Sequence, residues 1–220
     1  MKTGYNIAID GPAGAGKSTI AKKIAKKMNF IYVDTGAMYR AMALYLLRKG
    51  IDPADADRIA EVCQEADISI EYQNGEQVVL LNGENVNAYI RTEEIGSMAS
   101  CSSAVPAVRE KLVELQRRLA AKADVVMDGR DIGTVVLPDA DVKVYLTAGS
   151  ATRAKRRYLE LLEKGEKPDL AQIEQKIIDR DYQDMHREHS PLRQAEDAVL
   201  VDSSDMTIDE VVERISSLCR

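Results

Sequence analysis

A glycine-rich stretch near the start of the sequence, Gly11-Pro-Ala-Gly-Ala-Gly-Lys-Ser18, has the spacing of a phosphate-binding loop, G-x-x-x-x-G-K-[ST]. Glycines allow consecutive backbone N–H groups to turn inward and form a concave anion site. We expect the Lys17 ammonium to contact the β- and γ-phosphates of a nucleotide and the Ser18 hydroxyl to bind Mg²⁺. The residues assigned to nucleotide binding are Gly11, Pro12, Ala13, Gly14, Ala15, Gly16, Lys17, Ser18 and Thr19.

The sequence on either side of this loop decides against a chance glycine-rich turn. Residues 5–9, Tyr-Asn-Ile-Ala-Ile, form an apolar run typical of a buried strand. Residues 18–28 predict a helix, because Ile20, Ile24 and Met28 recur four apart and lysines fill much of the polar face. Strand, loop and helix follow in the order that the motif requires, and the helix adds its positive N-terminal end.

Arginines are grouped at helical spacing in the C-terminal third of the chain. Such spacing puts side chains on one helix face, where they could clamp the charge of a transferring phosphoryl group. The alternative is a solvated face with an exposed ion pair of little energetic value, and spacing alone leaves both interpretations open. The groups are Arg153, Arg156 and Arg157 on one helix, and Arg180, Asp184 and Arg187 on the next.

Charged residues also follow two of the predicted strands directly. Asp34 ends one strand, and Asp128-Gly-Arg-Asp-Ile-Gly133 follows another. In open α/β sheets ligands bind outside the carboxyl ends of the strands, so Asp34 and Arg130 are candidate site residues. Asp128 is expected near Mg²⁺, acting indirectly as the acidic partner of Ser18. His186 and His189 look like exposed helix-end residues, and we expect no catalysis from them.

Composition limits the partners. The chain has 220 residues, a length that suits one domain. Its net charge of −6 disfavours a nucleic acid polymer as partner. There is no apolar run of about 18 residues, and Met1-Lys-Thr-Gly leads straight into a strand, which argues against a membrane span and a signal peptide. The three cysteines are far apart and suit free thiols in a reducing compartment, so we expect a cytoplasmic protein. We also expect a monomer.

Strands alternate with helices along most of the chain, which predicts an α/β fold with a five-stranded parallel sheet flanked by helices. Further helices are expected from Thr35 to Gly50, from a cap at Asp52-Pro53 to about Ala66, from Thr92, from Pro106, from a cap at Ser150 to near Gly165, from Asp169 to about His186, and after a capping box of Thr207 and Glu210. The five strands are expected at residues 5–9, 30–33, 125–128, 142–146 and 198–202.

Residues 67–91 have a different pattern. Apolar residues alternate in 68–72, and Asn74-Gly75 and Asn82-Gly83 are hairpin turn signals on either side of a strand at 77–81. A third strand is expected at 86–90. This predicts a small antiparallel meander inserted into the α/β chain.

Through these residues the chain resembles the bacterial cytidylate kinases over nearly its whole length. The stretches that carry the resemblance are residues 9–19, 34–40 (Asp-Thr-Gly-Ala-Met-Tyr-Arg), Ala99-Ser100 with Pro106 and Arg109, 128–134 (Asp-Gly-Arg-Asp-Ile-Gly-Thr), and 180–187 before Ser190-Pro-Leu192. The resemblance implies the P-loop kinase fold and a meander in the monophosphate-binding region. The expected division is a core of residues 1–66, 92–149 and 169–220, an insert at about 67–91 and a mobile lid at about 150–168.

The resemblance also implies the reaction, which is phosphorylation of CMP and dCMP by ATP with Mg²⁺ through direct in-line transfer. It implies that Ser100, Arg109 and Asp131 read the cytosine ring, that Arg40 and Arg130 hold the CMP phosphate, that Arg180 and Asp184 contact the sugar, and that Thr35 lies in the substrate site. Arg153 and Arg157 of the lid and Arg187 would close over the phosphates and act with Lys17 and Arg130 in catalysis. Two alternatives stay open: another P-loop kinase acting on AMP, UMP or a small metabolite, and a nucleotide-dependent regulatory switch.

Overall fold

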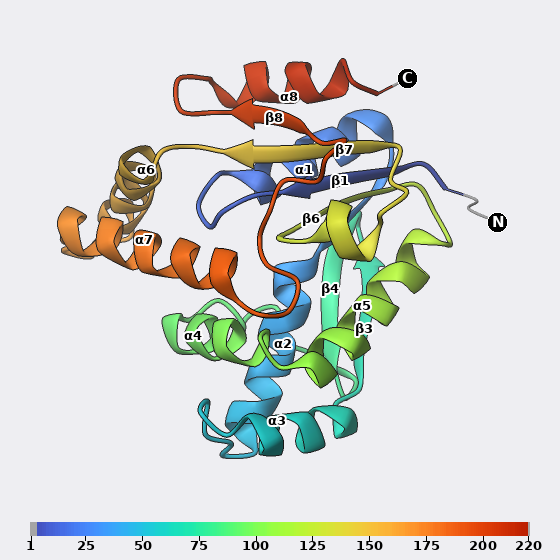
Figure 1. The fold of residues 1–220 in the computed structure, drawn as a ribbon, viewed down its shortest axis with the longest axis vertical. Helices are drawn as coiled ribbons and strands as arrows, with labels where there is room; N and C mark the ends of the chain where they lie inside the picture. Colours follow the sequence, from blue (N-terminus) through green and yellow to red (C-terminus); the bar gives the residue numbers. More distant parts are fainter. Residues whose placement is uncertain (1–3, 220) are drawn as a thin grey trace. The chain divides into compact units, whose positions relative to one another are not determined.

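The computed structural model describes residues 4–219, so Met1–Thr3 of the expected N-terminal lead and Arg220 lie outside it (Figure 1). Five strands form one sheet in the order β2-β6-β1-β7-β8, which confirms the predicted α/β architecture. β1 pairs in parallel with β7, with Ile7 opposite Val142, and β7 pairs in parallel with β8. The strands are β1 (Asn6–Asp10), β2 (Ile31–Asp34), β6 (Val125–Gly129), β7 (Val142–Thr147) and β8 (Val199–Asp202).

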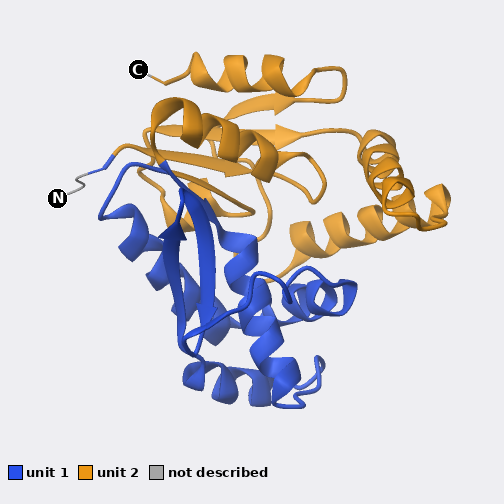
Figure 2. Ribbon diagram, turned by 180° about the vertical axis from the view of Figure 1, so that it is seen from behind, with its two compact units in different colours: residues 1–4, 31–125 blue, residues 5–30, 126–220 orange. Residues whose placement is uncertain are grey.

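The chain divides into two compact units (Figure 2). Unit 1 comprises residue 4 and residues 31–125, and unit 2 comprises residues 5–30 and the described part of the chain from 126. The predicted division into core, insert and lid follows other boundaries and stays a prediction.

Unit 2 holds the glycine-rich loop. Two of its helices, α1 and α8, lie side by side, joined at the surface by ion pairs of Lys23 with Asp209 and of Lys27 with Glu213. The predicted capping box at the start of α8 is confirmed. The other two helices, α6 and α7, pack against each other (Figure 1). The helices of this unit are α1 (Lys17–Met28), α6 (Ser150–Glu163), α7 (Leu170–His186) and α8 (Ile208–Ser216).

The described part of unit 1 is built from strand β2, four helices and the insert. Its core contains the fully buried side chains of Met38, Met42 and Leu46 on α2, Met98 on α4 and Leu112 on α5. Met38, Met42 and Leu46 recur every four positions along α2, so one face of this helix supplies much of the core. The helices are α2 (Thr35–Arg48), α3 (Ala56–Val62), α4 (Glu93–Ser102) and α5 (Pro106–Ala120), with a short 3-10 turn, η1, at Cys63–Glu65.

The insert is a three-stranded antiparallel sheet of β3 (Ile68–Gln73), β4 (Glu76–Leu81) and β5 (Glu84–Asn85). Both predicted turns are present, because Asn74-Gly75 and Asn82-Gly83 all have positive φ, as a two-residue hairpin turn requires. The third strand expected at 86–90 is wrong: β5 is shorter and lies earlier in the chain. Val86 and Ile90 are buried four residues apart on a helical turn, in which the Ile90 N–H donates to the Val86 carbonyl.

Two helix starts differ from the sequence prediction. Helix α3 begins at Ala56 rather than at Asp52-Pro53, and its N-cap is Asp55. Asp52 instead accepts a hydrogen bond from the backbone N–H two residues on, so it closes a turn ahead of the helix. Ser150 does not cap α6, because its hydroxyl donates to Glu174 at 2.9 Å and the N-cap residue is Gly149. Over residues 4–219, no helix has the length and apolar character needed to cross a membrane.

Candidate active site

The glycine-rich loop joins the end of β1 to the start of α1 in a conformation that needs glycine. Gly11 has φ of +149°, and a Cβ there would lie 1.9 Å from the carbonyl oxygen of Leu146 on β7. Gly16, the N-cap of α1, has φ of +87°. A side chain at either position would therefore force the loop away from β7 or out of its turn. The loop geometry expected from the sequence motif is present.

Lys17 is buried and turned back over this loop. Its ammonium donates to the carbonyl oxygen of Pro12 at 2.7 Å. Burial, and then the positive charge of Arg130, lower the pKa of Lys17 to about 7, against the opposing effect of Asp128, Asp10 and Asp184. An anion beside this ammonium would favour its charged form, which is the environment that phosphate oxygens supply.

Ser18 and Asp128 meet in the structure. The Ser18 hydroxyl donates to Oδ2 of Asp128 at 2.9 Å, across 110 positions of sequence. A hydroxyl and a carboxylate oxygen are ligand types that suit Mg²⁺. In the part of the chain that the structure describes, no group of three or more His, Cys, Asp or Glu side chains could hold a metal. A magnesium ion at this pair would therefore take most of its ligands from nucleotide phosphates and water, as it commonly does.

Asp10 is a site residue that the sequence analysis left without a role. Its carboxylate accepts hydrogen bonds at 2.7 Å from the backbone N–H groups of Ile132 and Gly133. These residues begin a short π-helical segment, η2 (Ile132–Val136), in the loop after β6. Burial raises the pKa of Asp10 to about 6, against the lowering effect of the two hydrogen bonds. Asp10, which directly precedes the glycine-rich loop, is thus hydrogen bonded to the segment that follows Arg130 and Asp131.

The arginines after β6 and at the end of α7 are paired with aspartates. Arg130 Nε donates to Asp184 at 2.8 Å, and Arg187 Nη2 lies 3.7 Å from Asp131. Burial works to raise the pKa of Asp184, but Arg130 holds it below its usual range, with smaller contributions from Arg180 and Arg187. Asp184 is buried, so the interpretation of α7 as only a solvated face with an exposed Arg180–Asp184 pair does not hold.

The three arginines of α6 have different surroundings. Arg153 is buried, and its guanidinium donates to the carbonyl oxygen of Ala13 in the glycine-rich loop at 2.9 Å and to Asp181 on α7 at 2.6 Å. Arg156 donates to the backbone carbonyl of Ser203 at 2.6 Å. Arg157 is half exposed and pairs with Glu160 one turn along the same helix. Of the three, Arg153 contacts the glycine-rich loop.

Unit 1 positions Arg40 and Thr35 at the junction of β2 and α2. Asp34 caps α2 by accepting the Ala37 N–H at 2.8 Å, and Thr35 is buried at the first position of the helix. The other carboxylate oxygen of Asp34 lies 3.4 Å from Arg40 and 3.4 Å from Arg91. The strand-end aspartate thus holds the arginine that the sequence assigned to a phosphate.

Ser100 and Arg109 lie on α4 and α5 of unit 1. Arg109 is buried, donates to the carbonyl oxygen of Ser103 at 3.4 Å, and has its guanidinium carbon 5.8 Å from the ring centre of Tyr39. Ser100 is partly buried, and its carbonyl oxygen accepts from the Ser103 hydroxyl at 2.8 Å. Ser103 therefore contacts both residues that the resemblance assigns to base recognition.

Comparison with known proteins decides the family. A family model described as cytidylate kinase matches residues 7–220. The chain belongs to the cytidylate kinase family. It is 52% identical to a cytidylate kinase of Lactobacillus gasseri over 96% of this chain and 92% of that protein. It is 48% identical to one of Shouchella clausii over 100% of this chain and 98% of that protein. These matches confirm the family, and with it the kinase class, predicted from the motifs.

The solved structures that resemble the chain support the fold. A gluconokinase from Sinorhizobium meliloti aligns with a TM-score of 0.50 and 14% identity, covering 100% of this chain and 94% of that one. An identity this low carries information about architecture alone, and it agrees with the P-loop kinase fold predicted from the sequence.

Three residues with contacts to site residues were missed from the sequence: Asp10, Asp181, and Gln77, whose side chain hydrogen bonds to the backbone of Asp34. Asp10 ends an apolar strand directly before Gly11, and the strand-end rule applied to Asp34 and Asp128 would have selected it. Asp181 adjoins Arg180 in a stretch already noted, but its partner Arg153 lies on another helix. Gln77 has no local signal, since it is a polar residue at the start of a strand that continues as Val-Val-Leu-Leu.

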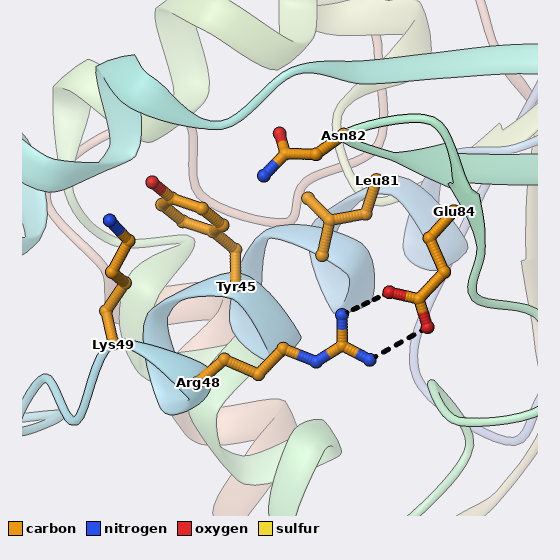
Figure 3. A pocket seen from close by; sticks show the side chains of 6 residues that line it. All are labelled: Tyr45, Arg48, Lys49, Leu81, Asn82 and Glu84. Carbon is orange, nitrogen blue, oxygen red and sulfur yellow. Dashed lines mark hydrogen bonds and ion pairs between the residues drawn. The ribbon is translucent and has the colours of Figure 1, made fainter.

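A cavity of about 270 Å³ lies elsewhere in unit 1, at the end of α2 beside the turn between β4 and β5 (Figure 3). Arg48 in its wall makes two hydrogen bonds to Glu84, at 2.6 and 3.0 Å, and Lys49 pairs with Glu65. The positive charges are thus neutralised by carboxylates, so this cavity is a poor site for a polyphosphate. The lining residues are Tyr45, Arg48, Lys49, Leu81, Asn82 and Glu84.

Proposed function

We propose that the protein transfers the γ-phosphoryl group of ATP to CMP and dCMP, giving ADP with CDP or dCDP. The observation that carries this proposal is the hydrogen bond between Ser18 and Asp128. It joins the end of the glycine-rich loop to the end of β6, directly before Arg130 and Asp131, two of the residues assigned to the acceptor. This contact supports a donor site next to acceptor-binding residues in unit 2.

On the donor side, the backbone N–H groups of residues 13–19 and the Lys17 ammonium would hold the phosphates of ATP. Ser18 would bind Mg²⁺ directly and Asp128 would do so indirectly. When bound, the ion would neutralise charge on the phosphates during transfer. Arg153, which is hydrogen bonded to Ala13 of the loop, would contact a phosphate bound there.

On the acceptor side, no strong general base is required. The second pKa of a phosphate monoester is about 6, so CMP is largely dianionic near neutral pH and its oxygen is already a nucleophile. Positioning and charge neutralisation then suffice, and arginines supply both. Arg40 and Arg130 are proposed to hold the acceptor phosphate, and Arg187 and Arg157 to neutralise charge during transfer.

Ser100, Arg109 and Asp131 are proposed to select cytosine. Cytosine presents an amino donor and an unprotonated N3 acceptor where uracil presents the reverse. A carboxylate accepts from that amino group, and an arginine donates to N3 or O2. Uracil would leave buried polar groups mismatched, which can discriminate by several powers of ten. Arg180 and Asp184 would contact the sugar, and Thr35 would line the substrate site.

Residues 150–168 are proposed to act as a lid that excludes water and so limits hydrolysis of ATP. We also propose that the protein works as a monomer in the cytoplasm on small nucleotides. The net charge of −6 supports small nucleotides over a nucleic acid polymer, because a polymer would require a broad positive surface.

The test is a coupled assay of ADP formation with CMP, dCMP, UMP, AMP or no acceptor. We expect rapid turnover with CMP and dCMP and at least a hundredfold lower kcat/KM with UMP. A preference for AMP or UMP would establish another monophosphate kinase. Turnover of ATP that is equally fast with and without an acceptor would point instead to a regulatory ATPase.

A further inference from the structure

Gln77, on strand β4 of the insert, makes two hydrogen bonds to a single residue outside it. Its side-chain Oε1 accepts the backbone N–H of Asp34 at 2.9 Å, and its Nε2 donates to the backbone carbonyl of Asp34 at 3.2 Å. One side-chain amide therefore satisfies both main-chain groups of Asp34, as a neighbouring β-strand would.

These contacts fall on an edge of the main sheet. β2 is the end strand in the order β2-β6-β1-β7-β8, and the main-chain groups along its outer edge need partners outside the five strands. Tyr72, which lies opposite Gln77 in the β3–β4 register, donates its hydroxyl to the carbonyl of Tyr32 at 3.1 Å. Tyr32 and Asp34 are two positions apart, so their main-chain groups point to the same side. The insert thus completes the edge of β2 with side chains.

The backbone of Gln77 is itself held in place. Asn87, in the turn after β5, donates to the carbonyl of Gln77 at 2.9 Å and accepts the N–H of Val79 at 3.0 Å. Gln77 is also partly buried. Its amide is therefore presented to β2 from a strand whose backbone other contacts hold in place.

The residue that Gln77 holds lies beside two arginines of this unit, Arg40 and Arg91. Asp34 is buried, caps α2 through one carboxylate oxygen, and lies 3.4 Å from Arg40 and from Arg91 through the other. The direction of this carboxylate depends on the backbone of Asp34. A chain of contacts therefore runs from the insert through Gln77 and Asp34 to Arg40.

We propose that Gln77 is a positioning residue for the acceptor phosphate, acting by holding the Asp34 main chain so that Asp34 presents Arg40. The assignment of Arg40 to that phosphate rests on the proposed function. On this view the insert fixes the β2–α2 junction at which a monophosphate is bound.

The test compares Gln77→Met with Gln73→Met in the full-length enzyme. Methionine keeps the length of glutamine and removes both hydrogen bonds, while Gln73 is an exposed glutamine on the neighbouring strand of the same hairpin. Loss of the two bonds should raise KM for CMP roughly tenfold in Gln77→Met. Because Arg40 would bind the phosphate in the ground and transition states alike, kcat and KM for ATP should stay within about twofold. Gln73→Met should match the unmodified enzyme.

A purely structural role would give a different result. If Gln77→Met lowers the melting temperature but leaves KM for CMP unchanged, or lowers kcat with both substrates together, the inference is wrong. Gln77→Glu guards against a variant that fails to fold: it keeps length and polarity, but a carboxylate cannot donate to the Asp34 carbonyl, so KM for CMP should still rise. If the unmodified enzyme uses another monophosphate, the proposed substrate fails, and the same comparison with that acceptor still decides the role of Gln77.

Discussion

The buried Lys17 predicts that nucleotide binding takes up a proton. In the structure burial and Arg130 lower the pKa of Lys17 to about 7, so this side chain is about half protonated at pH 7 and about one tenth protonated at pH 8. Phosphate oxygens beside the ammonium would restore its ordinary high pKa. Binding should therefore take up about half a proton at pH 7 and about 0.9 at pH 8, and the affinity should fall about fivefold between these values.

The assay is isothermal titration calorimetry with magnesium and a non-hydrolysable ATP analogue, at pH 8, in buffers of different ionisation enthalpy. The slope of the observed enthalpy against the buffer enthalpy gives the number of protons taken up. Lys17→Met is the matched control, since it keeps the length of the side chain and cannot titrate. Equal slopes for the two proteins, or no uptake at pH 8, would refute the reasoning.

The same shift has a consequence for the ligand-free protein. Lys17 has a lower pKa in the folded protein, about 7, than its ordinary value of 10.5. Between these values the unfolded chain binds more protons than the folded one, so the contribution of Lys17 to the free energy of unfolding increases as the pH rises through this window. Lys17→Met should remove this dependence from urea titrations across the window. Lys17→Ala should abolish phosphoryl transfer while the circular dichroism spectrum stays unchanged, because the loop glycines set the fold of this segment.

Three further substitutions test the contacts of unit 2. Asp10→Asn should lower the free energy of unfolding by about 1–3 kcal/mol, because the two backbone hydrogen bonds go to different carboxylate oxygens and an amide has one oxygen. The pKa of Asp10 is raised to about 6, so the part of the stability that comes from its protonation is complete below about pH 4 and is lost as the pH rises through 6. Urea titrations of the variant should lack this pH dependence. Asp131→Ala should raise KM for CMP far more than KM for ATP in steady-state assays, and an equal loss for both substrates would argue against base recognition. Asp181→Ala should destabilise the protein by about 3 kcal/mol in urea unfolding, because it leaves the buried Arg153 without its carboxylate partner. The control Asp179→Ala, at an exposed position on the same helix, should cost under about 0.5 kcal/mol. Similar losses for both variants would exclude a special role for the Arg153–Asp181 pair.

Features that depend on neighbouring residues could be predicted from the sequence. The glycine-rich loop is one, because the positive φ angles of Gly14 and Gly16 are values that glycine adopts readily. The turns Asn74-Gly75 and Asn82-Gly83 are others, since a two-residue hairpin turn requires two positive φ angles. The Thr207–Glu210 capping box likewise closes within four residues.

Local prediction failed where two local signals competed. The apolar spacing of residues 86–90 allowed a strand, but Asn87 binds the backbone of β4 with its side chain and a helical turn follows. In the same way the sequence predicted Asp52 at the start of α3, whereas the structure uses Asp52 for a turn and Asp55 as the cap. Side chains that bond to nearby backbone groups offer the chain alternatives of similar energy, and packing chooses between them.

The sequence by itself determined the family, the order of strands and helices in the α/β part of the chain, and the glycine-rich loop, because each is encoded in residues close together in the chain. The tertiary structure alone decided which arginine of α6 reaches that loop. Arg153, Arg156 and Arg157 share a helix face, and only the surroundings of each position separate Arg153, bonded to Ala13, from the others. Only the tertiary structure also revealed that Asp10 is hydrogen bonded to Ile132, 122 positions away. Contacts between distant segments depend on how the whole chain packs, and hydrogen-bonding groups carry no local mark of their partners.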